Sequence, residues 1–204
     1  MVAATPQRDA PERIDTDRLR LEPYRPGDGA WLHVAMKQNR DHMAASLAGI
    51  REGLGFDLTD PRDAEVFVRQ LGRDWVARRR FVYAVRERDT VEFVGELWVE
   101  SVDWSVPLLE IGYFVYVGRG YATEAAHAVL RMLFHDLNAA KVRVTTDAAN
   151  IRSARVAERC GFTLEGRLRS EAKGSDGTVV DALHYGMLPA EFDAHRSDGR
   201  SDGW

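Results

Sequence analysis

Features that often mark a function directly are scarce in this chain. Cys160 is its single cysteine, so an internal disulfide is excluded, and a buried structural thiol is the simplest interpretation of it. The 28 basic and 32 acidic residues give a formal charge of −4, which argues against nucleic-acid binding because nucleic-acid-binding domains are usually basic. His127 and His184 have no clustered partners at ligand spacing, so no metal site is predicted.

Long apolar runs are also missing. No stretch approaches the ~20 apolar residues of a membrane-spanning helix, and the N-terminus lacks the apolar segment of a signal peptide. We therefore expect a cytoplasmic protein with no membrane partner. A chain of 204 residues with 45% hydrophobic content can bury one sizeable core, so we expect one domain at 14–190. The polar segments 1–13 and 191–204 are expected to be flexible.

The hydrophobic periodicity predicts a mixed α/β order. Helices are expected at about 27–47, 61–79 and 151–159, and a loop followed by a helix at 118–136. Strands are expected at 18–23, 81–87, 92–102, 109–116, 142–147, 162–172 and 178–188. A central sheet covered by helices fits this order.

A short glycine loop, Gly118-Arg119-Gly120, separates the strand expected at 109–116 from the helix that follows it. Glycines let the backbone approach a ligand, and the first N–H groups of a helix have no helical partners, so an anion can accept from several of them. The loop lacks the third glycine of a dinucleotide fingerprint and the Gly-Lys-Ser/Thr of a P-loop. A pyrophosphate suits it, and a plain tight turn is the structural alternative.

About thirty residues further on, Asn150-Ile151-Arg152-Ser153 opens a short helix that ends at Gly161-Phe162. With the glycine loop, this pattern resembles the acyl-CoA core of the GNAT acetyltransferases. Within them it is similar to the RimJ/RimL group, which acetylates protein N-termini. Further matches, such as Glu110-Ile111-Gly112-Tyr113, extend the resemblance over about residues 14–190. The resemblance implies an α/β fold with a mixed, mostly antiparallel central sheet whose middle strands splay, flanked by helices.

Acetyl-CoA is the acetyl donor that the resemblance implies. A backbone N–H around Phe114 or Val115 would then receive the thioester carbonyl, the loop amides from Gly118 to Thr123 would receive the pyrophosphate, and Asn150 would lie along the pantetheine arm. The implied cofactor-binding residues are Phe114, Val115, Gly118, Arg119, Gly120, Tyr121, Ala122, Thr123 and Asn150. Asn150 can at the same time cap the helix that starts at Ile151.

The resemblance also implies two catalytic residues. Many relatives outside this group have a tyrosine four residues before the Gly-Phe glycine, and this chain has Ala157 there, so Ser153 is expected to protonate the leaving thiolate. Its structural alternative is a first-turn serine bonded to the backbone. Glu110 matches a glutamate that points toward the acceptor amine in relatives, but it could equally form an ion pair with Arg143. Glu96 is a second, weaker candidate.

Amine chemistry points to an acceptor class. An α-amino group has a pKa of about 7.7 to 8.0, so on the order of a tenth of it is neutral at pH 7, against well under a thousandth of a lysine. A site with only a modest base therefore favours a protein N-terminus. Acetylation of a small amine or antibiotic, or a non-catalytic acyl-CoA-binding module, are the alternatives. Exposed strand edges are compatible with a homodimer.

Overall fold

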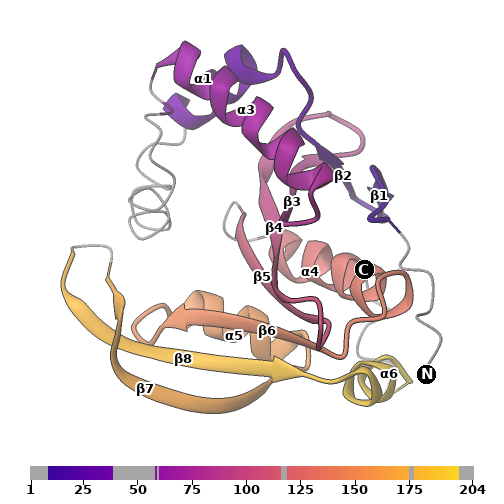
Figure 1. The fold of residues 1–204 in the computed structure, drawn as a ribbon, viewed down its shortest axis with the longest axis vertical. Helices are drawn as coiled ribbons and strands as arrows, with labels where there is room; N and C mark the ends of the chain where they lie inside the picture. The colour runs from indigo at the N-terminus through magenta and orange to yellow at the C-terminus, as the bar shows by residue number, and fades with distance from the viewer. Residues whose placement is uncertain (1–8, 39–57, 59, 116–118, 175–176, 198–204) are drawn as a thin grey trace.

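The computed structural model describes residues 9–38, 58, 60–115, 119–174 and 177–197. An eight-stranded sheet carries the fold, in the order β1-β2-β3-β4-β5-β6-β8-β7 (Figure 1). The strands are β1 (Ile14–Asp15), β2 (Leu19–Pro23), β3 (Arg80–Glu87), β4 (Phe93–Asp103), β5 (Leu108–Val115), β6 (Lys141–Asp147), β7 (Thr163–Lys173) and β8 (Val179–Met187). The helices are α1 (Gly29–Gln38), α3 (Pro61–Val76), α4 (Tyr121–His135), α5 (Ile151–Arg159) and α6 (Pro189–Ser197).

Helices cover both faces of the sheet, and each face has its own hydrophobic cluster. On one face, α1 and α3 pack through Leu32, Phe67 and Leu71 against β3, β4 and β5. On the other, α4 and α5 pack through residues such as Val129 and Ala157. The apolar residues of each helix recur at helical spacing, so one side of the helix can be buried against the sheet.

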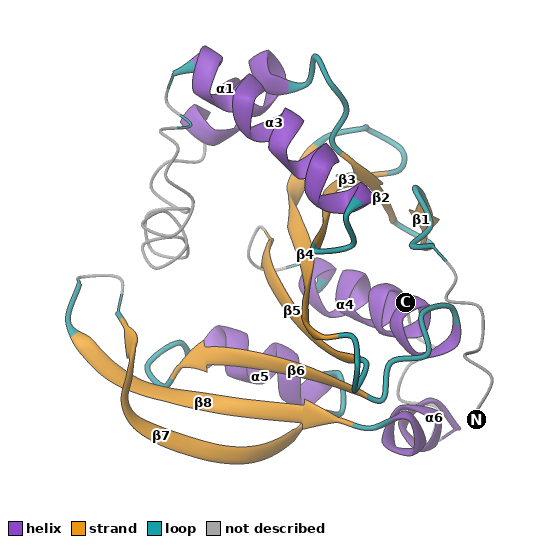
Figure 2. Ribbon diagram, in the orientation of Figure 1, coloured by secondary structure: helices purple, strands orange, loops and turns teal. Residues whose placement is uncertain are grey.

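The β5 and β6 strands are paired over only part of their length. Their parallel ladder joins Leu108, Leu109 and Glu110 to Lys141, Val142 and Arg143, and among the described residues it ends there. Every other ladder of the sheet is antiparallel. Beyond Glu110 the two strands diverge (Figure 2). The expected fold class, a mostly antiparallel sheet with splayed middle strands, is confirmed.

The predicted elements are present, with shifted ends. Helix α5 has the predicted bounds. Helix α3 ends at Val76 rather than at 79 because Arg78 has a φ of 55°, which a right-handed helix cannot contain. Helix α1 is described as far as Gln38, and the rest of the helix expected to 47 lies outside the described residues. None of the helices in the described ranges is both long and apolar enough to cross a bilayer.

Two segments expected to be flexible are in part folded. The tail expected from residue 191 begins inside α6, where Phe192 is 1% exposed and lies 5.2 Å, between ring centroids, from Phe134 of α4. At the other end Ala10 is buried, and the Pro11 carbonyl accepts a hydrogen bond of 2.9 Å from the Tyr83 hydroxyl. The flexible-tail expectation was wrong for these residues because a few apolar side chains suffice to anchor a polar segment. Residues 1–8 and 198–204 lie outside the described ranges, and the domain limits at 14–190 stay a prediction.

Helix α6 should contribute measurably to stability through one side chain. Phe192→Ala removes a buried ring, and such truncations typically cost about 3 to 5 kcal/mol. We expect a lower midpoint in urea unfolding followed by circular dichroism. Leu188→Ala, at a side chain 47% exposed, is the matched control and should shift the midpoint little. Equal midpoints for the two variants would show that α6 is not anchored as described.

Candidate active site

The glycine loop ends at a helix start that requires glycine. Gly120 is the N-cap of α4 and has a φ of 74° and a ψ of 5°, in the left-handed region that side chains disfavour. The Glu124 N–H donates to the Gly120 carbonyl at 3.2 Å, so the amides of Tyr121, Ala122 and Thr123 precede the first helical bond. These amides are available to an anion. Gly118, the first residue of the expected set, lies outside the described residues.

Arg119 of the loop and Tyr121, the first residue of α4, both contact the end of β3. Arg119 Nη1 lies 2.6 Å from Glu87 Oε1, and the Tyr121 hydroxyl donates to the same carboxylate. These contacts lower the pKa of Glu87, the Tyr121 hydrogen bond most of all. The Arg119 guanidinium therefore already pairs with Glu87. Its backbone N–H is better placed than its side chain to bind an anion.

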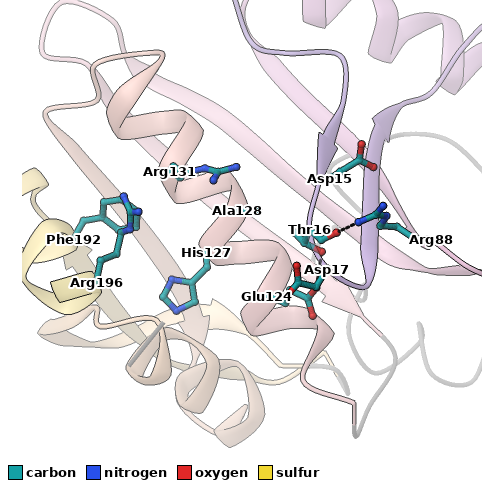
Figure 3. A pocket seen from close by; sticks show the side chains of 10 residues that line it. All are labelled: Asp15, Thr16, Asp17, Arg88, Glu124, His127, Ala128, Arg131, Phe192 and Arg196. Carbon is teal, nitrogen blue, oxygen red and sulfur yellow. Dashed lines mark hydrogen bonds between the residues drawn. The ribbon is translucent and has the colours of Figure 1, made fainter. Parts of the chain in front are cut away.

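A buried carboxylate lies one turn into α4. Glu124 is 2% exposed, and its carboxylate accepts from the Thr16 hydroxyl at 2.5 Å and lies 2.5 Å from Arg18 Nη2. Figure 3 shows Thr16 beside Glu124 at the start of the helix. Arg18 Nη1 also donates to the Arg119 carbonyl at 2.9 Å. Arg18 therefore neutralises a negative charge that would otherwise lie beneath an anion-binding helix end, and it holds the loop at the same time.

A polar cavity of about 400 Å³ lies behind this network. Asp15, Asp17, His127, Arg131 and Arg196 are among its lining residues, along the outer side of α4 (Figure 3). It contains neither Ser153 nor Glu110, so it is separate from the predicted catalytic residues.

The start of α5 brings two hydroxyl groups together. The Asn150 side chain accepts from the Ser153 N–H at 3.1 Å, which confirms the expected helix cap. Ser153 Oγ lies 3.4 Å from the Tyr113 hydroxyl, which in turn donates to the Ser153 carbonyl at 3.1 Å. The Ser153 hydroxyl of α5 therefore points toward the Tyr113 hydroxyl of β5.

Sequence reasoning missed the part that Tyr113 plays in this arrangement, because it used the residue as part of a motif and gave it no role in the site. Tyr113 does pack against the core cluster, but its hydroxyl reaches Ser153. Burial, above all, raises its pKa, so the phenol stays protonated and can donate. The sequence contains the Ile111-Gly112-Tyr113 motif, but only the packing of β5 beside α5 identifies Ser153 as the partner of Tyr113.

Glu110 is engaged where the parallel ladder ends. Arg143 Nε lies 2.6 Å from Glu110 Oε2, and the two residues form the last pair between β5 and β6. The structure therefore adopts the ion pair that the sequence left as the alternative for Glu110. A role of Glu110 at the acceptor stays a prediction.

Glu96 occupies a different environment. Its side chain is 7% exposed, it accepts from the Tyr24 hydroxyl, and it lies opposite Phe114 in the ladder between β4 and β5. Burial raises its pKa to about 7, and the Tyr24 hydrogen bond opposes that rise. A carboxyl group with a pKa near 7 can exchange protons at neutral pH.

The residues present fit the acetyl-CoA that the sequence resemblance implies. The left-handed Gly120 and the first amides of α4 have the geometry that an anion such as a pyrophosphate would need, and any side chain at residue 120 would strain this turn. The divergence of β5 from β6 leaves the inner edge of β5 beyond Glu110, where Phe114 and Val115 lie, without a described strand partner. Within the described ranges, no group of three His, Cys, Asp or Glu residues could hold a metal ion.

Comparison with known proteins gives the family. Residues 18–163 match the acetyltransferase (GNAT) domain. Similar curated proteins include the uncharacterized N-acetyltransferase p20 of Bacillus licheniformis, 24% identical over 139 residues that cover 67% of this chain and 76% of that protein. Another is the SPbeta prophage-derived uncharacterized N-acetyltransferase YokL of Bacillus subtilis strain 168. It is 31% identical over 136 residues, covering 59% of this chain and 71% of that protein.

Solved structures with the same fold include RimJ of Mycobacterium smegmatis in complex with CoA-disulfide, with a TM-score of 0.73, 21% identity, and 89% of this chain and 90% of that chain covered. RimL, a ribosomal alpha-N-protein acetyltransferase in complex with coenzyme A, has a TM-score of 0.76 and 19% identity, with 87% of this chain and 98% of that chain covered. The microcin self-immunity acetyltransferase MccE, in complex with acetyl-CoA and AMP, has a TM-score of 0.70 and 20% identity, with 85% of this chain and 93% of that chain covered. With the family match over most of its length, this chain belongs to the GNAT acetyltransferases and is an N-acetyltransferase that uses acetyl-CoA.

Proposed function

We propose that the acceptor of this acetyltransferase is the α-amino group of a protein N-terminus. The observation that carries the proposal is the kind of acid and base that the structure offers around β5. The hydroxyls of Ser153 and Tyr113 are 3.4 Å apart and supply proton donors, whereas the candidate bases, Glu96 and Glu110, are carboxylates. A carboxylate is too weak a base to deprotonate a lysine ammonium to a useful extent, but an α-amino group needs little help near pH 7.

The residues have distinct roles in this proposal. The backbone amides of residues 119 to 123 bind the pyrophosphate, Asn150 lies along the pantetheine arm, and a backbone N–H at Phe114 or Val115 receives the carbonyl oxygen as it gains charge. Ser153 protonates the departing thiolate. The RimJ and RimL names of the structural neighbours are consistent with a protein acceptor.

A small amine is the second candidate acceptor. The fold is shared with MccE, whose structure contains AMP beside acetyl-CoA, so this architecture also occurs with small-molecule ligands. A homodimer and a cytoplasmic location, both expected from the sequence, stay predictions.

The glycine loop can be tested by adding one side chain. Gly120→Val forces a β-branched residue into a left-handed conformation and crowds the anion cradle. We expect acetyl-CoA affinity to fall at least about tenfold, or 1.4 kcal/mol, in calorimetric titration. Gly72→Ala, in α3 with nothing within 4 Å of the added carbon, is the control. Unchanged affinity in a folded Gly120→Val variant would remove the loop from the cofactor site.

Ser153 can be tested as the proton donor. Loss of a general acid typically lowers the rate about 10²- to 10⁴-fold, so Ser153→Ala should reduce kcat while the acetyl-CoA dissociation constant stays the same. Ser105→Ala, in the exposed turn after β4, controls for loss of a hydroxyl. Wild-type kcat in Ser153→Ala together with a loss in Tyr113→Phe would assign the donor role to Tyr113 instead.

The acceptor can be tested with two matched peptides. One carries a free N-terminus and a blocked lysine, and the other carries the reverse. We expect thiol release from acetyl-CoA with the first peptide and little with the second, because the α-amine is far more often neutral at pH 7. Polyamines and aminoglycosides serve as comparison acceptors. Preference for the lysine peptide or for a small amine would overturn the N-terminal assignment.

A further inference from the structure

Glu96 lies next to a close contact between β4 and β5. Gly95 has a φ of 152°, and a Cβ there would lie 2.2 Å from the Phe114 carbonyl oxygen. Only glycine allows this approach, and the ladder between β3 and β4 is irregular at the same point, between Val85 and Arg86. Glu96 follows directly and lies opposite Phe114. Directly opposed residues of an antiparallel pair have Cβ atoms about 4.5 to 5.5 Å apart on one face, so Glu96 and Phe114 are neighbours.

The face that receives Glu96 is otherwise aromatic. Tyr24, Trp31, Phe93 and Phe114 belong to or pack on the cluster beneath α1 and α3, with Phe93 and Phe114 rings 6.2 Å apart and Trp31 and Phe93 rings 5.1 Å apart. Burying a carboxylate in such surroundings costs free energy unless it is hydrogen-bonded or paired. Tyr24 is the hydrogen-bond partner, and among the described residues Glu96 has no cationic partner at ion-pair distance.

The ionisable groups near this carboxyl come from several elements. Tyr24 follows β2, Arg86 lies on β3 with its guanidinium carbon 4.1 Å from the centre of the Trp31 ring, and Asp28 precedes α1. Burial raises the pKa of Tyr24 well above its usual value. The charge of Arg86 lowers this pKa, and the charge of Asp28 raises it. From α1, α3 and β5, the cluster receives apolar and aromatic side chains such as Leu32, Phe67 and Phe114.

We propose that Glu96 is the proton acceptor for the amine in this reaction and that Tyr24 positions its carboxylate. The proposal rests on the N-acetyltransferase function above. As the nitrogen attacks, the N–C bond forms and the C–S bond breaks. The proton of the nitrogen passes to a Glu96 carboxylate oxygen, and the thiolate takes a proton from the Ser153 hydroxyl, which solvent restores.

The two candidate carboxylates differ in what already holds them. Glu110 is bound by Arg143 at 2.6 Å where the parallel ladder ends, and a carboxylate paired with a guanidinium is a poorer proton acceptor. Glu96 is held by a neutral phenol and lies beside Phe114, at the part of β5 that diverges from β6. Acid and base would then lie on opposite sides of β5, with Ser153 toward α5 and Glu96 toward β4. In this arrangement one group can accept the proton of the amine while the other donates to the thiolate.

The experiment uses the pH dependence of kcat/KM with an N-terminal peptide. The neutral α-amine and the Glu96 carboxylate must both be present, so we expect log kcat/KM of the wild-type protein to rise with a slope of about 2 at low pH. Glu96→Gln keeps an acceptor for the Tyr24 hydroxyl but removes the base. We expect it to lose about 10²-fold or more in kcat/KM at pH 8 and to show a slope of about 1, from the amine alone. Glu100→Gln, on the same strand and paired with Arg80, is the matched control.

A second variant keeps the carboxylate. Tyr24→Phe removes the hydrogen bond that opposes the rise in the pKa of Glu96, so the Glu96 limb of the profile should move to higher pH while activity at pH 9 is largely retained. This readout does not depend on Glu96→Gln folding well. A purely structural Tyr24–Glu96 contact predicts an unshifted limb.

The outcomes separate the two proposals. A folded Glu96→Gln variant with wild-type rate and slope would overturn the role of Glu96, and loss of the limb in Glu110→Gln instead would assign the base to Glu110. Either result leaves N-terminal acetylation intact if the free-amine peptide is still the preferred acceptor. If lysine peptides or small amines are preferred, the acceptor assignment fails, and the Glu96 limb can still be measured with the amine that reacts.

Discussion

The end of the parallel ladder at Glu110 and Arg143 is the constraint on which the site depends. Strands β5 and β6 share three register pairs and then diverge, so the inner edge of β5 has backbone groups that no described strand uses. Unpaired strand edges bind other groups readily. The Glu110–Arg143 ion pair lies where this divergence begins. The glycine loop, the α5 hydroxyl pair and Glu96 are all arranged around the open part of β5.

The charges around the glycine loop are balanced by a contact with the N-terminal part of the chain. The N-terminus of α4 attracts anions, but Glu124 lies only one turn into that helix and is buried. Arg18 compensates this charge and also holds the Arg119 carbonyl. The first strands of the chain are thus joined to the loop by a contact between residues more than one hundred positions apart, which couples the fold of the N-terminal segment to the anion site.

Proton chemistry is divided between the two sides of β5. Toward α5, the Ser153 and Tyr113 hydroxyls are neutral donors, and burial keeps the Tyr113 phenol protonated. Toward β4, burial gives Glu96 a pKa near 7. The same physical cause, loss of solvent, therefore favours the protonated form of both groups. The phenol remains a donor across the neutral range, whereas the carboxyl group titrates within it, and this difference suits one to give and the other to accept a proton.

Local sequence determined the elements and the glycine loop, because helical periodicity, the Gly118-Arg119-Gly120 loop and the cap at Asn150 depend on near neighbours in the chain. The bounds of α5 and the start of α4 near the loop follow from such signals. Tertiary structure alone identified Tyr113 as the partner of Ser153, Tyr24 as the partner of Glu96, and the docking of α6 through Phe192. It also formed the ion pair with Arg143 that the sequence offered only as one alternative for Glu110. Each of these pairs joins distant positions, and burial, which sets the pKa of Glu96, exists only once the chain has folded.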